Sequence, residues 1–213
     1  MTSNKTAAAK GLDVNAWIDA GLAAILAGGL AAVAVEPLAR GLGVTKGSFY
    51  WHFRDRDALL GAMVDRWAKT TEELIANVAG LCDPAARLES LIVAVHRSPK
   101  GLRTMRTMSA LAGHPAIGPR VRSVAKRQQT FLAQGFTELG LSAPRACAAA
   151  QLVHSATLGV GELEPLGIGF DSAAARQAYV EELVSYVRNV AATSKKVARR
   201  RSVPRKSRNL DPD

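Results

Sequence analysis

Apolar residues recur at spacings of three and four over most of the chain, which is the pattern of helices with one buried face. The first such segment runs from Val14 to Ala27, begins after a capping Asp13 and ends at Gly28-Gly29. Two shorter helices are predicted over 35–42 and 46–52, with a turn at Gly43 between them. A fourth, over 56–80, is long enough to join a small head to a separate body.

Beyond residue 80 one predicted helix follows another. The apolar spacing places these helices over 84–95, 99–112, 115–139, 143–160 and 172–193, with a Gly-rich loop before the last one. No stretch alternates apolar and polar residues for long enough to form a strand. We therefore predict an all-α protein with an N-terminal three-helix head that contains a helix-turn-helix, followed by a C-terminal helical domain.

The domain organisation follows from these segments and from the charge. Residues 1–11 are predicted to be a disordered N-terminus, 12–58 the helix-turn-helix domain, 59–194 a larger helical domain, and 195–213 a basic disordered tail. The net charge is +10, and eight basic residues but no acidic residue lie between Lys195 and Arg208. Basic tails of this kind often touch polyanions, although a solvated terminus without a function is an equal alternative.

Composition narrows the class of protein. Hydrophobic residues make up 48% of the chain, which permits a proper core, and much of that fraction is Ala, Leu and Val. No uninterrupted apolar run approaches the ~18 residues of a membrane span, and the first residues lack the apolar core of a secretory signal. A cytoplasmic location without a membrane partner is expected. Cys82 and Cys147 are interpreted as small, half-buried side chains.

The segment Val35–Phe53 carries the clearest chemistry. With Phe49 and Phe53 on the buried side of the 46–52 helix, its outer side presents polar, basic and aromatic groups instead of plain solubilising charge. Such groups position a duplex through its phosphates, while a few side chains read base edges. A short helix led by its N-terminal residues fits a major groove about 12 Å wide.

The run GVTKGSFYWHFRDRDALL, Gly43–Leu60, resembles the DNA-binding head of the TetR family of bacterial transcriptional regulators. The likeness covers residues 13–60, while the rest of the chain is similar to the family only in length and helical pattern. The resemblance implies that Thr45, Lys46 and Gly47 approach bases and that Tyr50, His52 and Arg56 hold phosphates. The predicted DNA-binding set is Thr45, Lys46, Gly47, Ser48, Tyr50, Trp51, His52 and Arg56.

Two residues of this segment keep alternative interpretations. Trp51 is also a candidate for packing between head and body, which we favour for it over a role in DNA binding. Glu36 stands where some family members place a base-reading Arg. Its carboxylate can accept a hydrogen bond from a cytosine amino group or cap its own helix, and we favour the cap.

The body shows no catalytic constellation, so an enzyme is not expected, and neither a cofactor nor a metal ion is predicted. Soft apolar side chains on four helices are candidates for lining an effector cavity: Trp67, Met105, Met108, Phe131 and Leu158. For each of them, plain core is the alternative interpretation. The family resemblance implies that residues 59–194 are a helical regulatory and dimerisation domain, which binds a small molecule that changes the spacing of two heads.

The 143–160 helix has little polar face, which indicates a central position or an interface. We predict that it pairs with the 172–193 helix across a two-fold axis. The predicted dimer residues are Leu152, Val153, Ala156, Tyr179, Leu183 and Val187.

These observations predict a homodimeric repressor that binds a palindromic operator in double-stranded DNA and is released by a small apolar or amphipathic effector. The main alternative is a DNA-binding regulator of the same fold without a small-molecule inducer, acting constitutively or through a protein partner. A small helical enzyme with a basic tail is a weak third interpretation.

Overall fold

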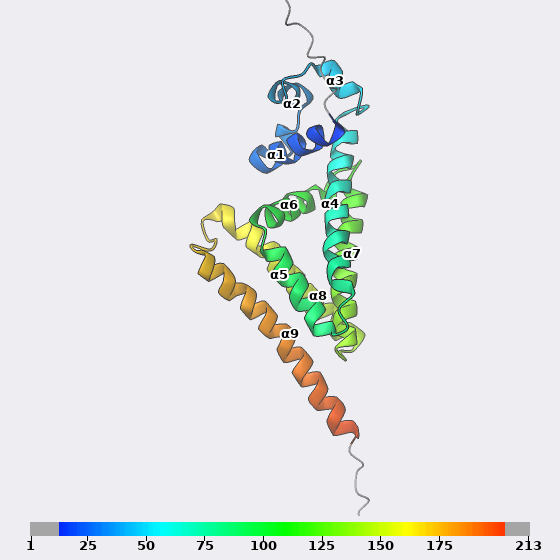
Figure 1. The fold of residues 1–213 in the computed structure, drawn as a ribbon, viewed down its shortest axis with the longest axis vertical. Coiled ribbons are helices and arrows are strands. Elements are labelled where there is room, and N and C mark those ends of the chain that lie inside the picture. The colour runs from blue at the N-terminus through cyan, green and yellow to red at the C-terminus, as the bar shows by residue number, and fades with distance from the viewer. Residues whose placement is uncertain (1–12, 203–213) are drawn as a thin grey trace, which may run out of the picture. The chain divides into compact units, whose positions relative to one another are not determined.

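The computed structural model describes residues 13–202, and within them it is all-α (Figure 1). The helices are α1 Val14–Ala32, α2 Val35–Gly41, α3 Lys46–Tyr50, α4 Arg56–Ala79, α5 Pro84–His96, α6 Pro99–Ser109, α7 Gly118–Glu138, α8 Ala143–Leu163 and α9 Ala173–Ser202, with 3₁₀ turns at Ala110–Gly113 and Glu164–Leu166. No strand occurs in this part of the chain. The predicted fold class is confirmed.

Of the helix ends that differ from the prediction, those of α1, α3 and α9 change its interpretation. α1 continues to Ala32, although Gly28 and Gly29 leave helical geometry at the predicted stop, where Gly29 has φ of 68°. α3 ends at Tyr50, two residues early, and Trp51 and His52 form a turn. α9 runs on to Ser202, so residues 195–202 of the predicted disordered tail are helical. The predicted disorder of residues 1–11 and 203–213 lies outside the described residues.

The chain divides into two compact units. Within the described residues, unit 1 comprises residues 13–73 and 98–128, and unit 2 comprises residues 74–97 and 129–202. Both α4 and α7 therefore begin in unit 1 and end in unit 2. The helix-turn-helix segment belongs to unit 1 together with α6. The predicted boundary between a DNA-binding and a regulatory domain at residue 58 stays a prediction.

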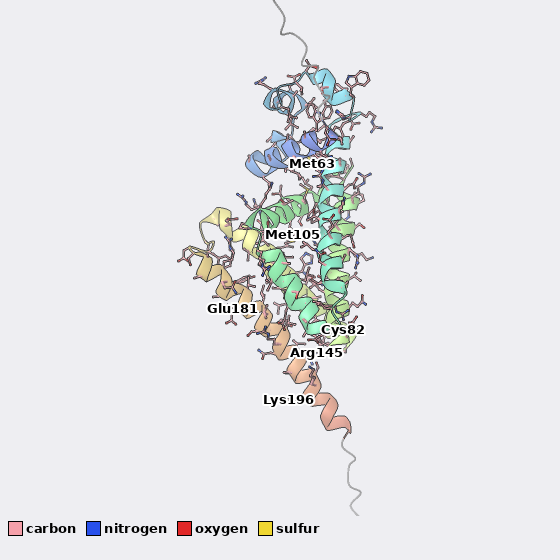
Figure 2. The ribbon with its side chains drawn as sticks, viewed as in Figure 1. Met63, Cys82, Met105, Arg145, Glu181 and Lys196 are labelled. Carbon is pink, nitrogen blue, oxygen red and sulfur yellow. The ribbon has the colours of Figure 1, made fainter. Side chains whose placement is uncertain are left out.

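The core of unit 1 is built around aromatic rings from α1 and α3. Trp17 and Phe49 are fully buried and meet edge to face, with ring centroids 5.3 Å apart. Phe53 extends the stack at 5.4 Å from Phe49. α4 closes against α1 where Gly21 faces Met63, which is labelled in Figure 2; a Cβ at Gly21 would meet the Met63 sulfur at 2.8 Å. Small and large side chains are thus matched across α1 and α4.

The core of unit 2 is made by α5, α8, α9 and the C-terminal part of α7. Buried residues are Ala85, Leu88, Ile92, Leu132, Phe136, Ala146, Ala149, Ala150, Val153, Val180, Val184, Val187 and Ala191. Alanines of α8 let its neighbours approach closely, while branched side chains from α9 fill the space between. The Tyr179 hydroxyl donates to the Ala156 carbonyl at 2.7 Å, which fixes the beginning of α9 against α8.

α1 corrects one expectation drawn from composition. Among the described residues it is the one helix whose length and apolar composition would allow it to cross a membrane. The expectation overlooked it because Asp19 interrupts the apolar run. In the structure, Trp17, Ile18, Gly21 and Ile25 of α1 are buried in unit 1. A core helix rich in Ala and Leu meets the same criteria of length and composition.

Candidate nucleic-acid interface

The turn between α2 and α3 has the geometry that a helix-turn-helix requires. Gly43 has φ of 68°, in the left-handed region that favours glycine. The Val44 N–H then donates to the Ala39 carbonyl at 3.0 Å, which closes the turn. Thr45 occupies the N-cap position of α3 in an extended conformation, but its side chain makes no capping hydrogen bond. Its exposed hydroxyl is therefore available to another partner.

The side chains of α3 divide sharply between core and surface. Phe49 is fully buried, whereas Tyr50 is 54% and the following Trp51 is 89% exposed. Thr45, Lys46, Gly47 and His52 are also exposed, and Ser48 is half-buried. Burial of Phe49 thus turns the predicted DNA-binding set outward, with Arg56 as the exception. Packing as the favoured role of Trp51 is wrong for the described residues, because its indole is almost wholly exposed.

Glu36 and Lys46 join the two helices of the motif at the surface. The Lys46 Nζ donates to Glu36 Oε1 at 2.8 Å, with 52% of the lysine and 65% of the glutamate side chain exposed. The hydrogen bond lowers the pKa of Glu36 and raises the pKa of Lys46, so both are charged at neutral pH. No side chain caps α2, whose N-cap residue is Ala34. The cap favoured for Glu36 is wrong, since its carboxylate bonds to Lys46.

Arg56, at the start of α4, has a different position from the predicted one. Its Nε donates to the Val33 carbonyl at 2.6 Å, and one terminal amine donates to the Leu30 carbonyl. These carbonyls lie at the end of α1, where the helix stops before α2, and the Leu30 carbonyl also accepts from the Val33 N–H at 3.2 Å. The half-buried guanidinium is thereby turned toward α1. Arg56 ties α4 to α1, and the phosphate-binding role predicted for it has no support in this position.

The start of α4 is fixed by its own cap. Asp55 Oδ1 accepts from the Ala58 N–H at 2.8 Å, as a capping carboxylate does. Arg54 also donates to Asp55 at 2.8 Å, and this bond lowers the pKa of the Asp55 carboxyl. The chain therefore leaves the exposed α3 through a well-fixed turn.

This part of the chain also matches a family model. Residues 18–63 match the model of bacterial regulatory proteins of the tetR family. The match spans α1 to the first part of α4, and it contains the turn and the exposed face described above. Residues 18–63 are a TetR-family domain. A search of curated protein sequences found no significant match.

Solved structures extend the likeness in fold to most of the chain. SCO4454, a TetR-family transcriptional regulator from Streptomyces coelicolor, aligns with a TM-score of 0.68 at 18% identity, covering 84% of this chain and 88% of its own. AibR, in complex with isovaleryl coenzyme A and operator DNA, aligns with a TM-score of 0.67 at 16% identity, covering 81% and 96%. FadR from Bacillus subtilis, in complex with stearoyl-CoA, aligns at 0.62 and 15%, covering 81% and 98%. The chain thus has the fold of TetR-family regulators.

The predicted effector-binding residues fall in both units. Trp67, Met105 and Met108 belong to unit 1 and are buried, while Phe131 and Leu158 belong to unit 2 and are half-buried. Their assignment to an effector cavity stays a prediction, and Trp67, Met105 and Met108 also serve as ordinary core residues of unit 1. Within the described residues, no group of three His, Cys, Asp or Glu side chains is placed to hold a metal ion.

The predicted dimer residues divide into inward and outward side chains. Val153 and Val187 are in the core of unit 2, so they pack within their own chain, which corrects their assignment. Ala156, Tyr179 and Leu183 are half-buried, and the Tyr179 hydroxyl is bonded to α8. Leu152 on α8 is 53% exposed and lies next to the exposed Ala148 and Ser155 on one helix face. Leu152 is therefore the member of the set best placed to meet a partner.

Two features of the surface were missed or misjudged at the level of sequence. Cys82 and Cys147 are exposed, not half-buried as expected. The bond between Glu36 and Lys46 was missed because ten residues separate its partners, a spacing that no helical rule connects. The signal available in the sequence was an acidic residue in α2 within a segment otherwise suited to DNA.

Proposed function

We propose that the protein is a DNA-binding transcriptional regulator that acts as a homodimer on a palindromic operator, most simply as a repressor in the cytoplasm. The observation that carries this proposal is the exposed face of α3. Thr45, Lys46, Gly47, Tyr50 and Trp51 are held outward by the buried Phe49, in a fold shared with AibR, a protein solved with operator DNA. The donor-rich start of α3, with Thr45 and Lys46, suits base edges, and the exposed hydroxyl of Tyr50 suits phosphates.

A dimer follows from the size of this face. α3 has five residues, so one copy can reach few base pairs. Two copies related by a two-fold axis read two half-sites about 34 Å apart, which multiplies specificity and makes the operator palindromic. The exposed Ala148 and Leu152 on the outward side of α8 offer apolar contacts for the pairing of two copies.

We propose that the effector is a small apolar or amphipathic molecule. Support comes from AibR and FadR, whose solved complexes contain acyl-coenzyme A ligands, and from the buried methionines and tryptophan of unit 1. The effector must bind the form that is incompetent for DNA better than the competent form, and its largest effect equals that preference. We assign no catalytic step to the protein.

The decisive experiment is selection of genomic fragments by the purified protein, followed by binding assays on the enriched motif. We expect an inverted repeat and a decrease in affinity of about tenfold or more in Lys46→Ala. Lys69→Ala is the matched control, because Lys69 is an exposed, ion-paired lysine on α4 outside the α3 face. Enrichment of no motif, or equal decreases in both variants, would overturn the proposal.

The effector is sought separately by thermal shift with a panel of acyl-coenzyme A thioesters and free acids. A ligand that stabilises the protein should also release it from the selected operator. If no member of the panel stabilises the protein, the alternative without a small-molecule inducer is favoured.

A further inference from the structure

The ion pair between Glu36 and Lys46 is unusual for a surface that is to meet a polyanion. A carboxylate at this surface repels phosphate groups. It also holds the ammonium of Lys46 in one position by an ion pair. The hydrogen bond of 2.8 Å places both groups together at the edge of α2 and α3. Thr45 and Gly47, which flank Lys46 in the chain, are exposed with it.

The pair is not needed to hold the two helices together. Leu38, Ala39 and Phe49 are buried where α2 and α3 pack, and the bond from Val44 to Ala39 closes the turn. Ion pairs between largely exposed side chains add little to stability because water screens them and both side chains lose entropy. Since the pair adds little to stability, we look for its role in contacts with DNA.

The major-groove edge of a G·C pair offers the complementary pattern. Guanine presents the acceptors N7 and O6, and the cytosine amino group N4 is a donor beside them. A lysine ammonium followed by a carboxylate presents the matching donor and acceptor. Lysine is a common partner of guanine O6 and N7, and glutamate accepts from cytosine N4. The charges of the protein pair thus meet opposite partial charges across one base pair.

We propose that Glu36 and Lys46 act together as one reading unit for a single G·C base pair in each half-site, with Lys46 on guanine and Glu36 on cytosine. This inference rests on the proposed function and names specificity-determining residues for it. The unit also fixes the orientation of the base pair. With the pair reversed, the carboxylate would face guanine acceptors and the ammonium would face the cytosine amino group.

An A·T pair is a poorer match for the same unit. Adenine has one acceptor, N7, beside its amino donor, and the acceptor O4 of thymine lies next to the C5 methyl group. An ammonium directed to O4 would lose hydration against that methyl without a second acceptor in reach. We therefore expect discrimination of about tenfold or more in favour of G·C in one orientation.

The test is selection of bound fragments from a random duplex library, with the wild type and with the charge-swapped double variant Glu36→Lys/Lys46→Glu. The swap keeps an ion pair at the same place, so its thermal unfolding should match the wild type. We expect the wild type to select one G·C pair per half-site and the swapped variant to select C·G at that same position. The matched control is the double variant Lys69→Glu/Glu73→Lys, which swaps an exposed pair on α4 and should leave the motif unchanged.

The single variant Glu36→Ala gives a second measurement that does not depend on the swap. It should lose preference at this one base pair and bind non-specific duplex more tightly, because a negative charge that repels the polyanion is gone. A motif unchanged in Glu36→Ala, or the same base-pair orientation in the swapped variant, would overturn the reading unit while leaving the proposed function intact. Failure of the wild type to select any motif would instead overturn both.

Discussion

The guanidinium of Arg56 donates to the carbonyl of Val33 at 2.6 Å, across 23 residues of chain. This bond, with its companion to Leu30, links the first residue of α4 to the end of α1. Any rotation of α4 about its axis must carry the junction of α1 and α2 with it or break the two bonds. Arg56 thereby makes the start of α4 a fixed part of the TetR-family domain.

We predict that Arg56→Ala lowers the free energy of unfolding by roughly 1.5–3 kcal/mol, because it removes charge-assisted hydrogen bonds to carbonyls at a helix end. Urea denaturation followed by circular dichroism measures the change. Arg54→Ala is the matched control, since Arg54 is exposed and bonds to its neighbour Asp55. Equal stability of the two variants would contradict a stabilising role for the hydrogen bonds from Arg56 to Val33 and Leu30.

Substitutions of two aromatic residues in and next to α3 should affect stability and DNA binding separately. Phe49→Ala should lower the free energy of unfolding by about 3–5 kcal/mol, because the buried ring leaves a cavity against Trp17. Trp51→Ala should leave the unfolding midpoint nearly unchanged and weaken operator binding, since the indole is 89% exposed. Thermal unfolding and fluorescence anisotropy with labelled operator measure the two effects. Loss of stability in Trp51→Ala would show that the indole packs in solution.

The proposed dimer interface can be tested at the exposed face of α8. We expect Leu152→Glu to shift the protein from dimer to monomer in analytical ultracentrifugation, because a carboxylate would be buried without a partner. Leu81→Glu is the control at another exposed leucine, in the connection between α4 and α5. A dimer that survives Leu152→Glu at micromolar concentration would place the interface elsewhere.

We predict that His96 makes the free energy of unfolding decrease as the pH is lowered. Its ring is buried in unit 2, Nδ1 donates to the Ile92 carbonyl at 2.8 Å, and burial lowers its pKa. The unfolded chain takes up a proton as pH falls below about 6.5, and the folded chain does not follow until lower pH. The free energy of unfolding therefore has its full value above about pH 6.5 and decreases as the pH falls toward the lowered pKa of His96. The decrease is up to about 1.4 kcal/mol per pH unit for one proton.

The pH dependence is measured by urea denaturation between pH 5 and pH 8. His96→Gln should show a shallower decline than the wild type. His154 contributes in the same direction, because burial lowers its pKa as well, so the variant with both substitutions should be shallower still. An unchanged slope in His96→Gln would contradict a buried, neutral ring.

The eight basic residues between Lys195 and Arg208 are candidates for increasing the salt dependence of DNA binding. Lys196, labelled in Figure 2, still lies on α9, so deleting residues 195–213 would shorten the helix. Replacing the eight residues with Gln retains helix propensity. If these side chains neutralise phosphates, the slope of log K against log salt concentration should decrease by ~0.9 for each phosphate that the variant leaves unneutralised. An unchanged slope would identify this region as solvated surface.

The sequence by itself determined the helical fold and the place of the helix-turn-helix segment. Local spacing is sufficient for both: apolar residues three and four apart define each buried face, and Gly43 marks the turn that α2 and α3 require. The alternation of Phe49 with exposed neighbours also follows from helical periodicity. These features depend on residues close together in the chain.

Tertiary structure alone decided which groups meet across the chain. Arg56 bonds to carbonyls 23 and 26 residues earlier, and Lys46 bonds to a carboxylate ten residues earlier, so no local pattern could assign their partners. The same holds for α8, whose apolar surface on both sides gave no sign that Val153 faces its own chain and Leu152 faces outward. A pattern of hydrophobicity predicts that a side chain is buried, but only the packing of the folded chain determines which residues bury it.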